Sequence, residues 1–219
     1  CIGGDGTFRG AMALNEMGIN CIGIPGTIDN DIASTEFTIG FFTALDTAID
    51  AIDKLRDTSF SHQRCTVVEV MGRNCGDLSI FSGIACGAEI VITKDTGFSE
   101  PDILKQVQKA EKMGKRHLIV VVAENITDVF ALAKKIQDNS SYEARATVLG
   151  YIQRGGTPSA FDRILASKMG VHAVDLLREG KGGYAVYTKS LDVSQIELSK
   201  ALEVEVKPSS LYSYLNKLN

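Results

Sequence analysis

The stretch that decides the fold is Cys21-Ile22-Gly23-Ile24-Pro25-Gly26-Thr27-Ile28-Asp29-Asn30-Asp31. Its first four residues predict a short buried strand, and the proline, glycine and acidic residues that follow predict a loop. Two carboxylates and a hydroxyl on one loop can accept a proton, hold a metal ion and contact a phosphoryl group in transfer to an alcohol. An Asx-rich turn explains the same residues without any function. The loop alone leaves both interpretations open.

Outward from this loop, short β-rich runs alternate with longer helical patterns. One helical pattern carries an apolar stripe at spacings of three and four, formed by Phe42, Leu45, Ile49, Ile52 and Leu55. Such alternation predicts an α/β fold, with parallel sheets flanked by helices and ligands at the carboxyl ends of the strands. The expected strands are Cys21–Ile24, Cys65–Val70, Glu89–Thr93, His117–Ala123, Ala144–Gly150 and Tyr184–Thr188. The expected helices are Ile39–Arg56, Glu100–Met113, Asp128–Gln137 and Phe161–Glu179.

Composition narrows the class of protein. The 219 residues are 44% apolar and 23% charged, which is typical of a soluble protein with one large or two modest domains. The formal charge of −4 gives no basic field, so we expect neither a nucleic acid nor a membrane partner. Five cysteines without a CxxC pair indicate neither a zinc site nor a disulfide framework and favour a cytoplasmic location. The chain begins with Cys1 inside a strand pattern, so we expect the natural N-terminus to be missing.

A glycine-rich loop, Gly3-Gly4-Asp5-Gly6-Thr7, stands between an opening strand and a predicted helix. Glycines allow backbone amides to approach a phosphate chain, and a helix N-terminus adds partial positive charge. Asp5 could hold Mg²⁺, which prefers one or two carboxylates together with phosphate oxygens. A helix-capping Asp-Gly turn is an equally good interpretation of this motif alone.

Two later loops bring arginines to strand ends. Met71–Leu78 follows the strand Cys65–Val70 and carries Arg73 beside a glycine, where a phosphate could be bound by forked hydrogen bonds. Residues 143–158 add Arg145 and Arg154 near another Gly-Gly turn. A salt bridge or a solvated surface position would explain any one of these arginines.

Taken together the motifs are specific. GGDG (3–6), PGTIDND (25–31), MGRNCGDL (71–78), ATVLGYIQRGG (146–156) and AFDR (160–163), in this order, resemble the bacterial ATP-dependent phosphofructokinases. The resemblance runs from Gly3 to at least Gly183, and the family's N-terminal third is absent. It implies a two-domain, Rossmann-like architecture. Residues 1–40 and 153–203 would form part of the ATP-binding domain, and 41–152 and 204–219 the fructose 6-phosphate-binding domain.

The resemblance also implies an activity, a glycolytic kinase that transfers the γ-phosphoryl of ATP to O1 of fructose 6-phosphate with Mg²⁺. The catalytic residues would be Asp29 as proton acceptor, with Thr27 and Arg73 at the transferring phosphoryl. ATP would be bound by Gly4, Asp5, Gly6 and Thr7, with Asp5 also the metal ligand. The residues around the sugar phosphate would be Thr27, Asp29, Arg64, Met71, Gly72, Arg73, Glu124, Arg145, Tyr151 and Arg154.

Subunit sharing and regulation follow from the same resemblance. Arg64 and Arg145 match arginines that serve the site of a neighbouring subunit, which implies a homo-oligomer, most simply a tetramer. The family's effector site, which binds ADP or phosphoenolpyruvate, would include Arg56, Gly87, Glu89, Lys115, Arg116 and His117. Two positions depart from the family, Tyr151 where a histidine is usual and Met113 where a basic residue is usual.

Three alternatives remain. In pyrophosphate-dependent relatives Gly6 is typically Asp and Gly26 typically Lys, so glycine at both positions favours ATP. Lipid and NAD kinases share a GGDGT motif but do not combine it with the other loops. A non-catalytic or truncated subunit that binds sugar phosphate without turnover is the alternative outside enzymes, and this chain alone could be inactive.

Overall fold

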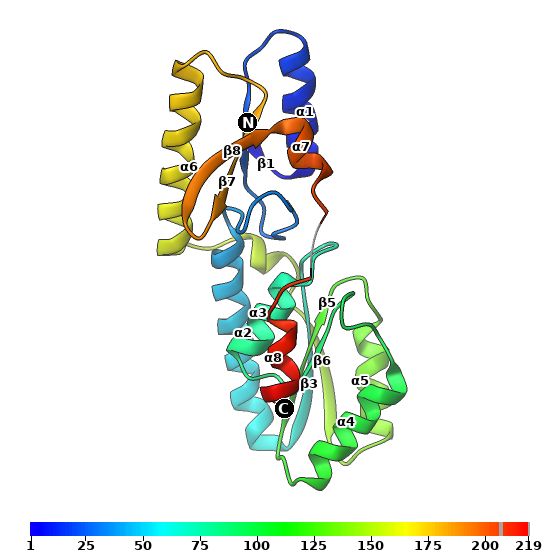
Figure 1. Ribbon diagram of the computed structural model, residues 1–219. Helices are drawn as coiled ribbons and strands as arrows, with labels where there is room; N and C mark the ends of the chain where they lie inside the picture. Colours follow the sequence, from blue (N-terminus) through cyan, green and yellow to red (C-terminus); the bar gives the residue numbers. More distant parts are fainter. Residues whose placement is uncertain (206–207, 219) are drawn as a thin grey trace. The chain divides into compact units, whose positions relative to one another are not determined.

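The computed structural model describes residues 1–205 and 208–218, and the chain divides into two compact units (Figure 1). Within the described residues, the first unit comprises 1–44 and 157–205, and the second comprises 45–156 and 208–218. The ligand of each unit stays a prediction. None of the helices in the described part of the chain is long and apolar enough to cross a membrane.

The first unit is built on a four-stranded sheet in the order β1-β2-β7-β8. The strands β1 (Ile2–Gly3), β2 (Ile22–Pro25) and β7 (Tyr184–Lys189) are parallel, and β8 (Asp192–Glu197) pairs antiparallel with β7. The sheet is therefore mixed, where the sequence predicts only parallel pairing. Ser190 and Leu191 adopt positive φ angles of 50° and 71° between the two strands, as a tight hairpin turn requires.

Helices cover both faces of this sheet, as predicted. Figure 1 shows α1 (Asp5–Glu16) and α7 (Leu198–Glu203) on one side and α6 (Ala160–Arg178) on the other. Phe8 of α1 packs with Leu198 of α7 and Ala185 of β7, while the buried stripe of α6 packs against the opposite face. Because neighbouring residues of a strand face opposite sides, Ala185 and Val186 belong to different clusters.

The second unit carries a parallel sheet in the order β4-β5-β3-β6, which confirms the predicted parallel pairing. Its strands are β3 (Arg64–Val70), β4 (Ile90–Ile92), β5 (Leu118–Ala123) and β6 (Glu143–Val148). The central β3 and β5 are largely runs of buried apolar residues, as expected for strands covered on both faces. The strand predicted to run from Ala144 to Gly150 ends at Val148. Gly150, with a φ of 57°, instead begins a 3₁₀ helix, η1 (Gly150–Arg154).

Two sets of helices cover the second sheet. The helices α4 (Glu100–Lys112) and α5 (Val129–Asp138) pack on one face, and α2 (Phe41–His62), α3 (Asp77–Ala85) and α8 (Tyr212–Leu218) on the other. The long helix α2 begins within the first unit. The sequence predicts α1, α2, α4, α5 and α6 but not α3, α7 or α8.

A buried carboxylate fixes the start of α2. Asp162 of α6 is 2% exposed and accepts hydrogen bonds from Gly40 N and Thr43 N, both at 2.8 Å. The Thr43 hydroxyl donates to the same carboxylate at 2.5 Å, and the Ser159 hydroxyl at 3.3 Å. Asp162 therefore satisfies amides at the helix N-terminus and keeps the first turn of α2 with the first unit.

We expect Asp162→Ala to lower the free energy of unfolding of the first unit by about 3 kcal/mol, because two buried N–H groups lose a charged acceptor. Urea denaturation followed by circular dichroism measures the change. Asp175→Ala is the control, since this aspartate lies on the same helix with a 56% exposed side chain. Equal urea midpoints for the two variants would contradict the anchoring role.

Candidate functional site

In the first unit, the two predicted phosphate-transfer loops lie side by side. Gly3 of β1 is in register with Pro25 of β2, and Gly26 N donates to Gly3 O at 3.0 Å just beyond the paired strands. A Cβ added to Gly4 would lie 3.9 Å from the Thr27 Cβ. The Gly4–Thr7 loop and the Pro25–Asp31 loop therefore share one carboxyl edge of the sheet, where ligands of such folds bind.

Glycines permit this approach for different reasons. A Cβ on Gly3 would meet Thr7 Oγ1 at 2.2 Å, and one on Gly26 would meet Ile2 Cγ2 at 2.9 Å. Gly6, in the first turn of α1, has open space around its Cα with no atom within 4 Å of such a Cβ. Packing thus favours glycine at positions 3 and 26, whereas Gly6 leaves room above the helix N-terminus for another molecule.

The Pro25–Asp31 loop is held by hydrogen bonds within the segment 27–38. Asn30, nearly buried and with a φ of 53°, accepts a hydrogen bond from Thr38 N at 2.9 Å and donates to Glu36 O at 3.3 Å. Thr38 Oγ1 donates to Thr27 O at 2.6 Å, and Asp29 N donates to Thr27 Oγ1 at 3.2 Å. The local turn is thus formed by the Thr27 hydroxyl, the Asn30 amide ties the loop to residues 36–38, and Asp29 is held half-buried at the strand end.

Asp5, the predicted Mg²⁺ ligand, lies at the N-terminal end of α1 with an exposed ion pair. It lies in the first turn of α1 with a 39% exposed side chain, and its carboxylate pairs with Arg9 one turn later at 3.3 Å. An exposed ion pair of this kind is weak. Among the described residues there is no cluster of three or more metal-binding side chains, so a resident all-protein metal site is absent there. One exposed carboxylate is the kind of donor that Mg²⁺ uses beside phosphate oxygens.

In the second unit, the loop after β3 is held by Glu124 at the end of β5. Glu124 Oε1 accepts hydrogen bonds from Gly72 N at 3.1 Å and Arg73 N at 2.6 Å. Both residues have positive φ, 149° at Gly72 and 54° at Arg73, and a Cβ on Gly72 would meet Cys75 O at 2.4 Å. The predicted Met71–Arg73 loop is thus locked in a conformation that few other residues would adopt.

The turn η1 brings two further sugar-phosphate candidates to the same unit. The Arg154 guanidinium lies 4.8 Å from the centroid of the Tyr151 ring, a cation–π arrangement, and Tyr151 is 77% exposed. Between them Gln153 is 1% exposed and accepts a hydrogen bond from Met71 N at 3.2 Å. Gln153 was not among the residues predicted from the sequence, although a glutamine between two candidate ligands on a short turn is visible in the motif.

The predicted partner-reaching arginines are held within this chain. Arg64 of β3 forms an ion pair with Glu143 Oε2 at 2.8 Å, and Arg145 of β6 pairs with the other oxygen of the same carboxylate. Glu143 lies directly opposite Arg64 in the parallel register, and β6 is the last strand of the sheet order. The Arg64 hydrogen bond, followed by Arg145, holds the pKa of the Glu143 carboxyl below its usual value of 4.5.

Three carboxylates, those of Glu69, Glu124 and Asp128, form an acidic cluster near the Met71–Arg73 loop. Burial raises the pKa of Glu69, and the neighbouring carboxylates of Glu124 and Asp128 raise it further. Asp128 also caps α5, with its side chain accepting from Phe130 N and Ala131 N. This negative charge stands beside the backbone that carries Arg73.

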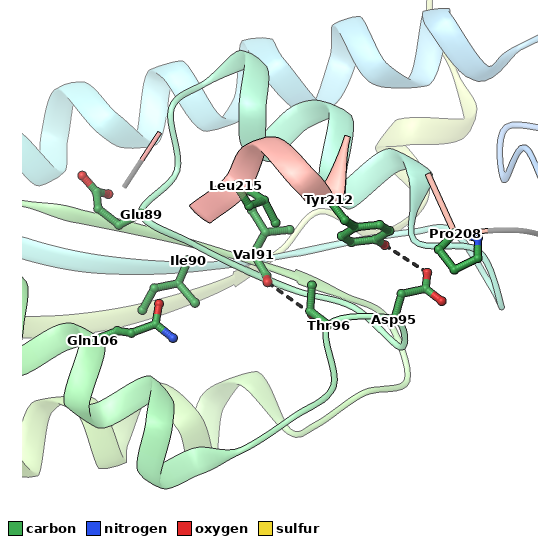
Figure 2. Close-up of a pocket in the computed structure, with 9 residues that line it drawn as sticks. All are labelled: Glu89, Ile90, Val91, Asp95, Thr96, Gln106, Pro208, Tyr212 and Leu215. Carbon is green, nitrogen blue, oxygen red and sulfur yellow. Dashed lines mark hydrogen bonds between the residues drawn. The ribbon is translucent and has the colours of Figure 1, made fainter. Parts of the chain in front are cut away.

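Among the predicted effector residues, Glu89 is the best anchored. Its carboxylate accepts from Lys115 Nζ at 3.2 Å and from Ile119 N at 2.9 Å. It lies between a small cavity near Met113 and Lys115 and a larger one of about 480 Å³. Figure 2 shows the larger cavity, lined by Glu89, Ile90, Val91, Asp95, Thr96, Gln106, Pro208, Tyr212 and Leu215.

The C-terminal helix forms one wall of this larger cavity. The Tyr212 hydroxyl donates to Asp95 Oδ2 at 3.1 Å (Figure 2). The same hydroxyl is 2.8 Å from Thr93 Oγ1. Burial is the first cause that raises the pKa of Tyr212 above its usual value, so the phenol stays protonated. No sequence pattern indicates this wall, because α8 falls in the last residues, outside every motif.

The remaining effector candidates lie in three different surroundings. The Nε and Nη2 atoms of Arg56 are buried and make no hydrogen bond within the described part of the chain. The pKa of the Cys86 thiol is raised to about 11, first by burial, and the positive charge of Arg56 lowers this pKa in part. Arg116 lies 5.3 Å from the centroid of the Phe60 ring, and His117 packs edge-on against that ring. Gly87 has a φ of 61° and follows the C-terminal end of α3.

Comparison with known proteins agrees with the fold and the motifs. A family profile described as Phosphofructokinase matches residues 1–177. An ATP-dependent 6-phosphofructokinase of Photobacterium profundum is 53% identical over 219 residues, 99% of this chain and 68% of the relative. That of Teredinibacter turnerae is 54% identical over 207 residues, 94% of this chain and 65% of the relative. The chain thus spans about two thirds of these relatives.

Solved structures show the same architecture. The phosphofructokinase of Saccharomyces cerevisiae superposes with a TM-score of 0.85 at 26% identity, covering 99% of this chain and 34% of that chain. A pyrophosphate-dependent phosphofructokinase of Nitrosospira multiformis gives a TM-score of 0.82 at 22% identity, covering 99% of this chain and 66% of that chain, and shows the fold alone.

The fold is α/β, and the strand ends of its sheets carry a glycine-rich loop, a carboxylate loop and arginine-bearing loops. The chain belongs to the phosphofructokinase family.

The Glu143 cluster gives a pH prediction. Because its pKa is lowered in the folded protein, its stabilising effect is present above the usual pKa of 4.5 and is lost as pH falls through the lower folded value. We expect the wild-type protein to melt above Glu143→Gln near neutral pH, with the gap narrowing below about pH 4.5. Thermal melts across this range measure it. Asp57→Asn, at an exposed carboxylate of the same unit, should give a smaller gap, and a Glu143→Gln gap that persists in acid would contradict the ion-pair account.

Proposed function

We propose that the whole protein transfers the γ-phosphoryl of ATP to O1 of fructose 6-phosphate, giving fructose 1,6-bisphosphate and ADP. One observation carries the proposal: the Gly26 N to Gly3 O hydrogen bond, which sets the glycine-rich loop beside the loop that carries Asp29. The named relatives above are ATP-dependent 6-phosphofructokinases, which supports the same activity.

Asp29 is the proposed general base. It takes the proton from the O1 hydroxyl as that oxygen forms a bond to the γ-phosphorus, while the bond from the γ-phosphorus to the β–γ bridging oxygen breaks and ADP leaves. Its backbone amide donates to Thr27 Oγ1 at 3.2 Å, which fixes the backbone from which the carboxylate extends. Thr27 contacts the transferring phosphoryl, and Arg73 neutralises its developing charge.

The Gly4–Thr7 loop is the proposed site of the ATP phosphates. Backbone amides at the N-terminus of α1 face the anion, and the helix dipole favours it. Asp5 would hold Mg²⁺ in exchange for its exposed pair with Arg9 at 3.3 Å. Mg²⁺, when bound, neutralises charge on the β- and γ-phosphates.

The second unit is the proposed sugar-phosphate domain. Met71, Gly72, Arg73 and Glu124 surround the sugar, and Tyr151 and Arg154 bind the 6-phosphate. Arg64 and Arg145 serve the site of a neighbouring subunit in a homotetramer, released from Glu143 by the phosphate dianion. ADP or phosphoenolpyruvate acts at the effector residues around Glu89, Lys115 and Arg56, with binding weakened by the neutral Met113.

Asp29→Ser should lower kcat by at least ~10²-fold with little change in sugar affinity, because a positioned base contributes on this scale. Steady-state kinetics of the full-length protein with ATP and fructose 6-phosphate measures it. Asp175→Ala, at an exposed carboxylate of the same unit, should keep normal turnover. Near-normal kcat in Asp29→Ser would remove Asp29 from the role, and a wild-type protein that binds sugar phosphate without turnover would favour the non-catalytic alternative.

Gly6→Asp tests the choice of ATP over pyrophosphate. The structure has open space at Gly6, so the new carboxylate should fold in place and repel the nucleotide phosphates, raising the KM for ATP about tenfold or more. Gly10→Asp is a matched control, because Gly10 lies on the same helix and is equally open. An equal KM for ATP in both variants, or faster wild-type turnover with pyrophosphate, would overturn the assignment of the donor.

A further inference from the structure

We infer that Gln153 is a positioning residue that holds the two sugar-phosphate loops of the second unit in register. The inference rests on the proposed function, because the loops matter as a pair only if one ligand contacts both. Its basis is that one buried side chain forms hydrogen bonds to two backbone groups, Met71 N and Gly150 O, that are far apart in the sequence.

The Gln153 amide uses both of its polar atoms on backbone. Oε1 accepts from Met71 N at 3.2 Å, and Nε2 donates to Gly150 O at 3.0 Å. Met71 is the first residue after β3, and Gly150 is the first residue of η1. With only 1% of its surface exposed, Gln153 has no access to a ligand and acts through the two segments that it joins.

This link continues a connection that the sheet cannot continue. β3 and β6 pair in register as far as Glu69 and Val148, and a backbone bond just beyond them runs from Leu149 N to Glu69 O at 3.1 Å. Past that bond the two chains leave the ladder and enter the loops of the candidate site. Beyond it, the Gln153 side-chain amide joins the two segments in place of a backbone–backbone hydrogen bond.

The side chain must be an amide of this length. A neutral group with one acceptor and one donor at the same end satisfies a buried N–H and a carbonyl together, and asparagine is one methylene shorter. An apolar replacement would leave Met71 N and Gly150 O without these partners, which costs more than the loss of an ordinary surface bond.

Each loop has a separate anchor of its own, so Gln153 governs their mutual placement. Glu124 fixes Gly72 and Arg73 on one side, and on the other Arg154 packs over the Tyr151 ring. Without Gln153 the Glu124 bonds and the Arg154–Tyr151 contact remain, while the spacing between Arg73 and the Tyr151–Arg154 pair is no longer set. A sugar phosphate that needs both would bind less tightly.

Gln153→Met in the full-length protein tests this. We expect the KM for fructose 6-phosphate to rise about tenfold, with the KM for ATP within about twofold of wild type. A merely structural loss would lower the amount of folded enzyme and so reduce kcat with both KM values unchanged. Gln153→Asn, a smaller change, should shift the same KM in the same direction and serves where the methionine variant folds poorly.

Gln137→Met is the matched control, because Gln137 also accepts a backbone N–H in this unit, from Ala144 at 3.3 Å. It should leave both KM values unchanged. Amide hydrogen exchange gives a readout without turnover: Gln153→Met should speed exchange in residues 71–73 and 150–154, and Gln137→Met should not.

The outcomes separate the two proposals. Unchanged exchange in both segments, or a sugar-phosphate KM within about twofold of wild type, overturns the positioning role even in an active enzyme. Faster exchange in Gln153→Met, together with a wild-type protein that shows no transfer to fructose 6-phosphate, supports the link and refutes the proposed function.

Discussion

Every loop of the candidate site begins where the hydrogen-bond ladder of a parallel strand ends, so its backbone groups must find partners elsewhere. The chain meets this constraint with single side chains that bond to backbone groups. Asn30 does so within the loop after β2, and Glu124 and Gln153, from other segments, accept hydrogen bonds from the loop after β3. Asp162 does the same at the start of α2. Rigid loops follow from this, and rigid loops are what phosphoryl transfer needs, since it depends on positioning and fixed charge.

Much of this could be predicted from the sequence, and the failures share a cause. Helical stripes and apolar runs located α2, α4, α5, α6 and most of the strands, because burial on one or two faces leaves a pattern. The hairpin strand β8 leaves none: its burial pattern has no fully buried residue, and its position depends on pairing with β7. α8 is short, and its packing on the second sheet depends on residues far away in sequence. Long-range pairing decides such elements, and local pattern does not.

The motifs located candidate residues at the strand ends, but they did not distinguish possible ligands from residues that support the loops. Glu124, expected beside the sugar, uses one carboxylate oxygen to hold two backbone amides, so any contact with a ligand falls to the other oxygen. Glu143 matched no motif role, yet it holds both Arg64 and Arg145. The sequence shows which groups are present at strand ends. Only the geometry shows that a carboxylate faces an amide or a guanidinium, because register and left-handed residues such as Arg73 set those directions.

The two glycines expected to favour ATP, Gly6 and Gly26, differ in their surroundings. Gly26 stands against the Ile2 side chain, where a Cβ would lie 2.9 Å from a methyl group, so packing alone favours glycine there. Gly6 has no such neighbour within 4 Å, and any residue of ordinary helix propensity would be more stable at that position than glycine. A glycine that packing favours carries less information about the ligand. Openness alone does not single out Gly6, because Gly10 on the same helix is equally open. What sets Gly6 apart is its place in the first turn of α1, where the backbone amides of a helix N-terminus would face a phosphate chain under the proposed function.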